Sequence, residues 1–278
     1  MHKLFFKLVI TFSLFAVISC NNTDNKKDDQ PSTTNNNNEP ATLNFTIVNQ
    51  FPHDTNAWTE GLEFYNHSLY ESTGSGNGND EGKSKLTAFD LSTGHTLKTI
   101  PLAKQYYGEG ITVMNNKVYQ LTWKEKTCFV YDAKTFQKIK EFTYDGEGWG
   151  MTNNGKLIIM SNGSSNLYFR DPETFKVLNT VGVTDNNGPV GNINELEYVK
   201  GYILANVWET DLILKINPES GKVIGKADFS GTELKYFPDS RVTSPIMNGI
   251  AYDSTSHKLY VTGKYWPKIF EVTGLTGE

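Results

Sequence analysis

The chain has 278 residues, of which 37% are hydrophobic and 21% charged, and its formal net charge is −5. That length allows one large β domain or two small ones besides a targeting segment. The acidic balance argues against nucleic acid or an anionic lipid surface as the main partner.

The first residues are typical of a bacterial lipoprotein signal. Residues 1–19 join a basic start, with Lys3 and Lys7, to an apolar run over 8–18 that is too short to span a membrane. The run ends in a small residue followed by Cys20, which resembles the lipobox whose cysteine sulfur is diacylated before cleavage. We expect cleavage there and lipidation of Cys20; loss of the two lysines takes the formal charge from −5 to −7. An ordinary secretory signal with an incidental cysteine stays open as the alternative.

Residues 20–41 form a predicted tether between the lipidated cysteine and a globular body at 42–278. Between Cys20 and Ala41 the segment is polar throughout, so it cannot bury enough apolar surface to fold and we expect it to be disordered. The anchor places the protein at the bacterial cell envelope. Asn21 favours the outer membrane if the cell is Gram-negative; the Lys-Asp-Asp run at 27–29 favours the cell surface, and the periplasmic side stays open.

Cys128 is the one thiol left after lipidation, so no internal disulfide is expected. It lies in a Thr-Cys-Phe-Val-Tyr pattern that is typical of a strand. We therefore expect a small buried hydrophobe there and not a nucleophile.

Self-similar units divide the body. Five short openings recur at spacings of 49, 40, 45 and 54 residues, and a turn and an apolar strand follow each one. In the first four units a third strand ends in Asp or Asn, which we expect to cap a tight turn by bonding to nearby backbone. The openings are Gly61-Leu62, Gly110-Ile111, Gly150-Met151, Glu195-Leu196 and Gly249-Ile250, and the capping residues are Asp90, Asp132, Asp171 and Asn217.

Four short antiparallel strands in each unit predict an all-β fold, a five-bladed β-propeller. The last unit, over 249–272, supplies three strands, whereas an unassigned strand at 43–50 precedes the first unit. We expect this N-terminal strand to complete the last blade and close the ring, so that no sheet edge is left exposed.

Polar and aromatic residues that break the repeat gather at the blade openings and just beyond. Loops at one rim of a propeller channel converge from every blade, so residues distant in the sequence meet there. Carboxylates buried among aromatic rings exchange protons near neutral pH, and a neighbouring lysine or amide polarises a carbonyl oxygen. Packing explains any one of these residues alone, but the set favours a site: Trp58, Glu60, Tyr107, Glu109, Trp123, Trp149, Asn194, Glu195, Glu197, Trp208, Asn248 and Lys264.

Metal ligands of the imidazole type are not predicted. The five histidines show no paired ligand spacing, so a transition-metal site has no support in the sequence. We expect no required cofactor and no metal among the site residues. Carboxylate and carbonyl oxygens leave a structural calcium ion in the channel open.

At these residues the chain resembles the plant and bacterial glutaminyl cyclotransferases, typified by the papaya enzyme. The resemblance covers 58–272, and the family's fold is a five-bladed propeller. It is carried by a set of motifs in order: Thr-Glu-Gly-Leu at 59–62, Tyr-Gly-Glu-Gly at 107–110, Gln-Leu-Thr-Trp at 120–123, Gly-Trp-Gly at 148–150, Asn-Glu-Leu-Glu-Tyr at 194–198, Ala-Asn-Val-Trp at 205–208 and Val-Thr-Gly-Lys-x-Trp-Pro-Lys at 261–268.

The resemblance implies an activity and a role for each residue. The family converts an N-terminal glutamine into pyroglutamate with release of ammonia, by acyl transfer within one molecule and without a metal. It implies that Glu109 handles the protons while Asn194 and Lys264 stabilise the amide oxyanion. The remaining residues would line the pocket or orient the amine: Trp58, Glu60, Tyr107, Trp123, Trp149, Glu195 and Trp208.

Three positions depart from the plant pattern. Glu60 stands where plant members have glutamine, and Trp58 and Tyr107 stand where phenylalanine is usual. If Glu60 lies close to Glu109, its charge raises the pKa of Glu109 and moves the pH optimum upward.

Two other readings stay open. One is a calcium-dependent propeller lactonase or hydrolase that uses the same carboxylates and amides as metal ligands. The other is a non-catalytic envelope propeller that binds a peptide or glycan. On the first-ranked interpretation the partners are peptides or proteins with an N-terminal glutamine. We expect a monomer that meets the membrane only through its lipid anchor.

Overall fold

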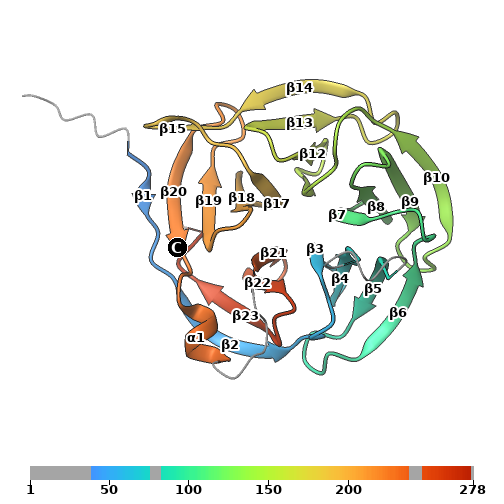
Figure 1. Cartoon of the computed structure of the whole chain (residues 1–278), viewed down its shortest axis with the longest axis horizontal. Helices are drawn as coiled ribbons and strands as arrows, with labels where there is room; N and C mark the ends of the chain where they lie inside the picture. The colour runs from blue at the N-terminus through green and yellow to red at the C-terminus, as the bar shows by residue number, and fades with distance from the viewer. Residues whose placement is uncertain (1–38, 76–82, 238–245, 277–278) are drawn as a thin grey trace, which may run out of the picture. The chain divides into compact units, whose positions relative to one another are not determined.

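Each repeat of the sequence forms one sheet in the computed structural model, which describes residues 39–75, 83–237 and 246–276. The described residues belong to a compact unit, Asn38–Glu278. The predicted signal, Cys20 and the tether up to residue 38 lie outside them. Five sheets of four or five strands stand around a common centre (Figure 1), so the predicted five-bladed propeller is confirmed.

In blades 1 to 3 the strands follow one another from the centre outward in chain order. Blade 1 contains β3 (Thr59–Tyr65), β4 (Ser68–Thr73), β5 (Lys85–Phe89) and β6 (Thr96–Pro101). Blade 2 contains β7 (Gly108–Met114), β8 (Lys117–Thr122), β9 (Thr127–Asp132) and β10 (Lys138–Thr143). Blade 3 contains β11 (Met151–Asn153), β12 (Ile158–Met160), β13 (Asn166–Arg170) and β14 (Val177–Gly182).

Blades 4 and 5 each take a strand from the N-terminal side of the body. Blade 4 contains β17 (Ile193–Val199), β18 (Tyr202–Val207), β19 (Leu212–Ile216) and β20 (Val223–Asp228), and β1 (Ala41–Thr42) adds to it parallel to β20. Blade 5 contains β21 (Ile246–Asp253), β22 (Lys258–Lys264) and β23 (Lys268–Thr273), with β2 (Thr46–Pro52) antiparallel to β23 as its outermost strand. The strand expected at 43–50 corresponds to β2, which begins at Thr46 and lies on the last blade. The short strand β1 on blade 4 was not expected, and it begins at Ala41, one residue before the predicted body.

Outside the blades lie a two-stranded ribbon and a short helix. The ribbon pairs β15 (Thr184–Asp185) with β16 (Gly188–Pro189), and α1 spans Thr232–Tyr236. Among the described residues, no helix is long and apolar enough to cross a membrane.

The tight turns between strands form as the sequence predicts. Asp132 accepts hydrogen bonds from the backbone N–H and the hydroxyl of Thr135 at 2.7 and 2.8 Å. Equivalent bonds join Asp90 to Thr93, Asp171 to Thr174 and Asn217 to Ser220. Blades 1 to 4 thus each stabilise this turn locally, because the bonded residues are only three positions apart.

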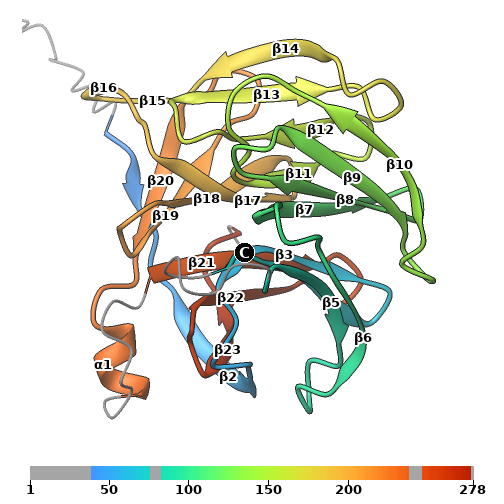
Figure 2. The ribbon, with the colours of Figure 1, turned by 45° about the vertical axis from the view of Figure 1, so that its right-hand side comes forward.

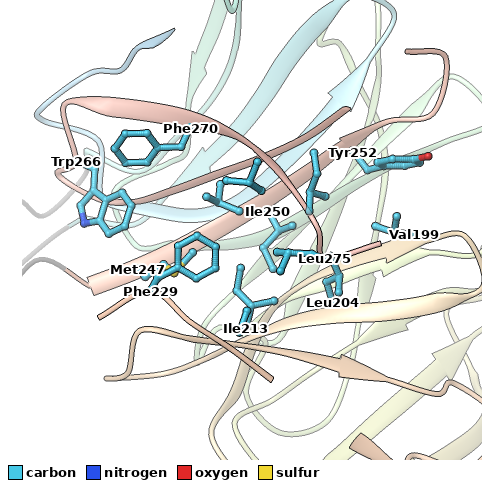
Figure 3. Packing of buried hydrophobic residues seen from close by; sticks show 14 of the residues in the cluster. Val199, Leu204, Ile213, Phe229, Met247, Ile250, Tyr252, Trp266, Phe270 and Leu275 are labelled. Carbon is cyan, nitrogen blue, oxygen red and sulfur yellow. The ribbon is translucent and has the colours of Figure 1, made fainter. Parts of the chain in front are cut away.

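Hydrophobic cores lie between neighbouring blades. In the largest, Leu204 and Ile213 of blade 4 pack with Ile250 and Phe270 of blade 5 (Figure 3). The other four clusters fill the remaining gaps around the ring. Cys128 is fully buried in one of them, as predicted, and burial raises the pKa of its thiol.

The inner strands come unusually close to one another at the blade openings. A Cβ on Gly61 would lie 2.5 Å from the backbone N of Ile111, and one on Gly150 would lie 2.0 Å from the backbone O of Asn194. Side chains cannot fit at such distances, so packing requires glycine at Gly61, Gly110 and Gly150. The turned view shows β3, β7, β17 and β21 stacked across the middle of the ring (Figure 2).

Buried carboxylates brace these inner strands. The two oxygens of Glu195 accept the backbone N–H groups of Leu62 at 3.2 Å and Ile250 at 2.9 Å, which belong to two other blades. Glu197 accepts the N–H of Tyr252 at 2.7 Å. Burial raises the pKa of both carboxyls well above the usual value, and it raises that of nearby Glu63 to about 7.

The substitution Glu197→Gln tests the electrostatic cost of this brace. Folding raises the pKa of Glu197 above its usual value of 4.5. Its contribution to the free energy of unfolding is therefore fully present below about pH 4.5 and is lost as the pH rises through the pKa of the folded state. Glutamine keeps an acceptor for Tyr252 and does not titrate. We therefore expect the loss of unfolding free energy between about pH 5 and about pH 8 to shrink, by up to about 1.4 kcal/mol per pH unit.

Denaturant unfolding at the two pH values measures this difference. The control is Glu173→Gln, because the pKa of this exposed carboxyl is lowered by Lys117 and Lys140 and its effect falls below the tested window. Equal pH dependence in the wild type and in Glu197→Gln would contradict the prediction.

Candidate active site

Four inner strands carry one extra residue where the predicted site begins. In blade 1, Thr59 pairs with Thr73 and Gly61 with Ser72, so that Glu60 has no residue opposite it. Such bulges bend a strand and redirect its side chains. The residues displaced in this way are Glu60 in β3, Glu109 and Gly110 in β7, Asn194 and Glu195 in β17, and Asn248 and Gly249 in β21.

Glu60 is the centre of a network drawn from three blades. Lys264 Nζ lies 2.7 Å from its Oε1, and both side chains are only 4% exposed. The Tyr107 hydroxyl donates to the same oxygen at 3.0 Å, and Asn248 Nδ2 donates to Oε2 at 3.3 Å. A buried ion pair is costly unless further hydrogen bonds satisfy it, and these two donors supply them.

The departures from the plant pattern thus contact each other. A carboxylate at Glu60 needs donors that a glutamine would not, and Tyr107 provides a hydroxyl where phenylalanine has none. Burial raises the pKa of Tyr107, followed by the charges of Glu60 and Glu109, so its hydroxyl keeps the proton that it donates.

Glu109 lies buried beside this network and is 6% exposed. Burial raises its pKa well above the usual value, and the charge of Glu60 raises it further, whereas Lys264 acts in the opposite direction. The carboxyl charges of Glu147 and Glu125 add to the rise. Burial and the nearby carboxylates therefore favour the protonated form of Glu109, and its predicted role in proton transfer stays a prediction.

The side-chain oxygen of Asn194 is buried without a hydrogen-bond partner among the described residues. The side chain as a whole is 3% exposed. A buried polar atom without a partner is costly and is expected where a ligand completes the bonding. This placement suits the predicted contact of Asn194 with a substrate amide.

Aromatic side chains from blades 1 to 4 line the same region. Trp123 contacts Tyr107 with ring centroids 5.6 Å apart, and Trp149 contacts Trp208 edge to face, also at 5.6 Å. Trp58 lies 4.7 Å from Lys264 Nζ, measured to the ring centroid. The structure therefore brings all five predicted pocket aromatics next to the carboxylates or to one another.

Glu195 differs from the other predicted residues, because both of its oxygens accept backbone N–H groups of the inner strands. Its predicted role in orienting a substrate amine stays a prediction. Glu197, the fourth carboxylate of the set, is engaged in the same way by Tyr252.

Two residues of the site were missed by the sequence reasoning. Glu147 accepts hydrogen bonds from two indoles of the pocket, and Tyr265 packs on Trp58 with centroids 4.9 Å apart. Trp58 and Tyr265 also line a cavity of about 370 Å³ beside the site. An acidic residue directly before the Gly-Trp-Gly motif was the available signal for Glu147.

The described residues contain no group of three or more His, Cys, Asp or Glu side chains arranged to hold a metal ion. The carboxylates of the site are instead met by a lysine, a tyrosine, amides and backbone N–H groups.

A family model, a plant protein and a bacterial crystal structure are similar to this chain. The family model for glutamine cyclotransferase matches residues 14–273. A glutaminyl-peptide cyclotransferase of Arabidopsis thaliana is 37% identical over 228 residues, which is 81% of this chain and 70% of the plant protein. The crystal structure of Myxococcus xanthus glutaminyl cyclase superposes with a TM-score of 0.78 at 32% identity, covering 84% of this chain and 98% of that one. The chain belongs to the glutamine cyclotransferase family.

Proposed function

We propose that this protein is a glutaminyl-peptide cyclotransferase that converts an N-terminal glutamine into pyroglutamate and releases ammonia. The observation that carries the proposal is Glu109, a buried carboxyl with a raised pKa beside the Glu60–Lys264 ion pair. The family membership and the names of both relatives support the same reaction.

The reaction needs one bond formed, one bond broken and one proton moved. The substrate's α-amine attacks its own side-chain amide carbon, a five-membered lactam closes, and the amide nitrogen leaves as ammonia. Glu109 takes the proton that the amine loses and delivers one to the leaving nitrogen. Because the attack is within one molecule, the chain contributes orientation and proton transfer and needs no covalent intermediate.

The neighbours of Glu109 hold the amide. Lys264 and the Nδ2 donor of Asn194 would bind the carbonyl oxygen as its negative charge develops, and the unpartnered Oδ1 of Asn194 would accept an N–H of the leaving amide nitrogen. Lys264 is already paired with Glu60 in the free site, so the oxyanion would compete with that carboxylate for the ammonium group. The indoles of Trp123, Trp149 and Trp208 would surround the glutamine and exclude water.

The first experiment incubates residues 21–278 with a Gln-initiated peptide, with and without EDTA. We expect ammonia release and the mass loss of one ammonia in both conditions, because the proposed reaction uses no metal. Glu109→Gln should lower kcat by at least about 100-fold, since it cannot transfer the proton, while the circular dichroism spectrum stays that of the wild type.

Other outcomes of these assays would favour one of the two alternative functions or remove Glu109 from its proposed role. Activity lost only in EDTA would favour the calcium-dependent hydrolase, and peptide retained without product would favour a binding propeller. Substantial turnover by Glu109→Gln would remove this residue from the proton-transfer role.

Glu60→Gln tests the departure from the plant pattern. The substitution removes a negative charge that raises the pKa of Glu109, so that pKa should fall. We expect the limb of the kcat/KM pH profile that reports Glu109 to move to lower pH. Glu141→Gln on the exposed edge of blade 2 is the control. An unmoved limb would show that the charge of Glu60 does not act on Glu109.

We also propose that the protein is a monomer anchored in the bacterial cell envelope by lipid on Cys20. If the cell is Gram-negative, the anchor would lie in the outer membrane, on its periplasmic side or at the cell surface. The apolar leader, the lipobox and the polar tether support this anchoring. In the producing cell, the wild type should enter the detergent phase on Triton X-114 partition. Cys20→Ser cannot be diacylated and should take up no labelled palmitate, whereas the wild type should take it up; equal labelling of the two would refute lipidation at this position.

A further inference from the structure

Glu147 joins two tryptophans that come from different blades. Its Oε2 accepts the indole N–H of Trp123 at 2.8 Å and that of Trp149 at 3.0 Å. Trp123 directly follows β8 of blade 2, and Trp149 lies just before β11 of blade 3. One carboxylate oxygen therefore fixes the distance between two walls of the proposed pocket.

Both indoles are also held from other sides. The Lys124 Nζ lies 3.6 Å from the ring centroid of Trp123. Trp149 packs on Gly163, where a Cβ would lie 2.6 Å from the ring, so no other residue fits beneath it. With these contacts in place, the bond to Glu147 sets where the indole edges lie rather than whether the rings stay in the site.

The two indoles are the middle of a longer row. Trp123 contacts Tyr107, whose hydroxyl donates to Glu60, and Trp149 contacts Trp208. A shift at Glu147 would thus reach the wall of blade 4 in one direction and the Glu60–Lys264 pair in the other.

Folding alone does not require this carboxylate. Glu147, Trp123 and Trp149 are each only partly buried, so water could satisfy the indole N–H groups at little cost. A charged acceptor instead makes stronger and more directional bonds than water does. Such rigidity is useful where a ligand must meet walls that are already in position.

We propose that Glu147 is a positioning residue of the active site, which fixes Trp123 and Trp149 so that they enclose the N-terminal glutamine of the substrate. This inference rests on the proposed function for the identity of the ligand. The bridge, by which we mean the two hydrogen bonds from Trp123 and Trp149 to Glu147, is present in the free protein and can be tested without catalysis.

Three variants separate the effect of the two hydrogen bonds that Glu147 accepts from the effect of its negative charge. Glu147→Leu removes the acceptor at similar volume, and Glu147→Gln keeps an acceptor oxygen but removes the charge. Glu125→Gln removes another charge that acts on Glu109 and leaves both indoles bonded to Glu147. Its amide oxygen still accepts the backbone N–H of Tyr107, which Glu125 holds at 3.1 Å. The charged groups that act most on the pKa of Glu109 are Glu60, Lys264, Glu147 and Glu125, and the hydroxyls of Tyr107 and Tyr144 also interact with it electrostatically.

The kinetic readout is KM against kcat for a Gln-initiated peptide. We expect Glu147→Leu to raise KM about tenfold with a smaller change in kcat, because an ordered wall binds ground state and transition state alike. Glu147→Gln should bring KM back to within about twofold of the wild type. Both Glu147→Gln and Glu125→Gln should move the Glu109 limb of the pH profile to lower pH, and Glu125→Gln should leave KM unchanged.

The second readout is the indole N–H resonances of ¹⁵N-tryptophan-labelled protein. Glu147→Leu should shift those of Trp123 and Trp149 and leave that of Trp266, which is buried in blade 5. If Glu147→Leu does not fold, Glu147→Ser gives the same test, because its hydroxyl cannot reach both indoles.

The two readouts distinguish failure of the inference from failure of the proposed function. If the wild type does not turn over any Gln-initiated peptide, the proposed function fails, and the resonances alone judge the bridge. Unmoved resonances of Trp123 and Trp149 would overturn it. If the wild type is active, a KM in Glu147→Leu within twofold of the wild type, or no rescue by Glu147→Gln, would overturn the positioning role.

Discussion

The close approach of the inner strands at the blade openings is the constraint on which the site depends. Gly61, Gly110 and Gly150 let neighbouring backbones approach within distances that no Cβ would allow. At the equivalent opening of blade 4 the residue is Glu195, whose carboxylate ties two other inner strands by their N–H groups. Extra residues at the same places then turn side chains toward one region of the ring.

The partners of each carboxylate determine its chemistry. Glu195 and Glu197 are met by backbone N–H groups, which makes them braces of the ring. Glu60 is met by a lysine, a tyrosine and an amide, so its charge is balanced within the site. The pKa of Glu109 is raised by burial and further by the charge of Glu60, and Glu109 is the carboxyl to which the proposed function assigns proton transfer. Identical side chains thus do different work because their surroundings differ.

The site is assembled from every blade, so its geometry depends on the closed ring. The Glu60–Lys264 pair joins blades 1 and 5, Tyr107 adds blade 2, and Glu147 joins blades 2 and 3. Hydrophobic cores between the blades fix these distances. Loss of packing between two blades would therefore disturb the chemistry even where no site residue is touched.

The sequence by itself determined the blade count and the capped turns of blades 1 to 4, because repeats and Asp- or Asn-capped turns are local patterns along the chain. Its blade-opening motifs predicted most of the residues that lie together around Glu60 but not Glu147 or Tyr265. Only the tertiary structure decided which carboxylate meets which partner. Nothing in the spacing shows that Lys264 pairs with Glu60 across the ring, that Glu195 binds backbone, or that Glu147 holds two indoles. These contacts join residues from different blades, and their distances are set by how the blades pack around the axis, which no local pattern records.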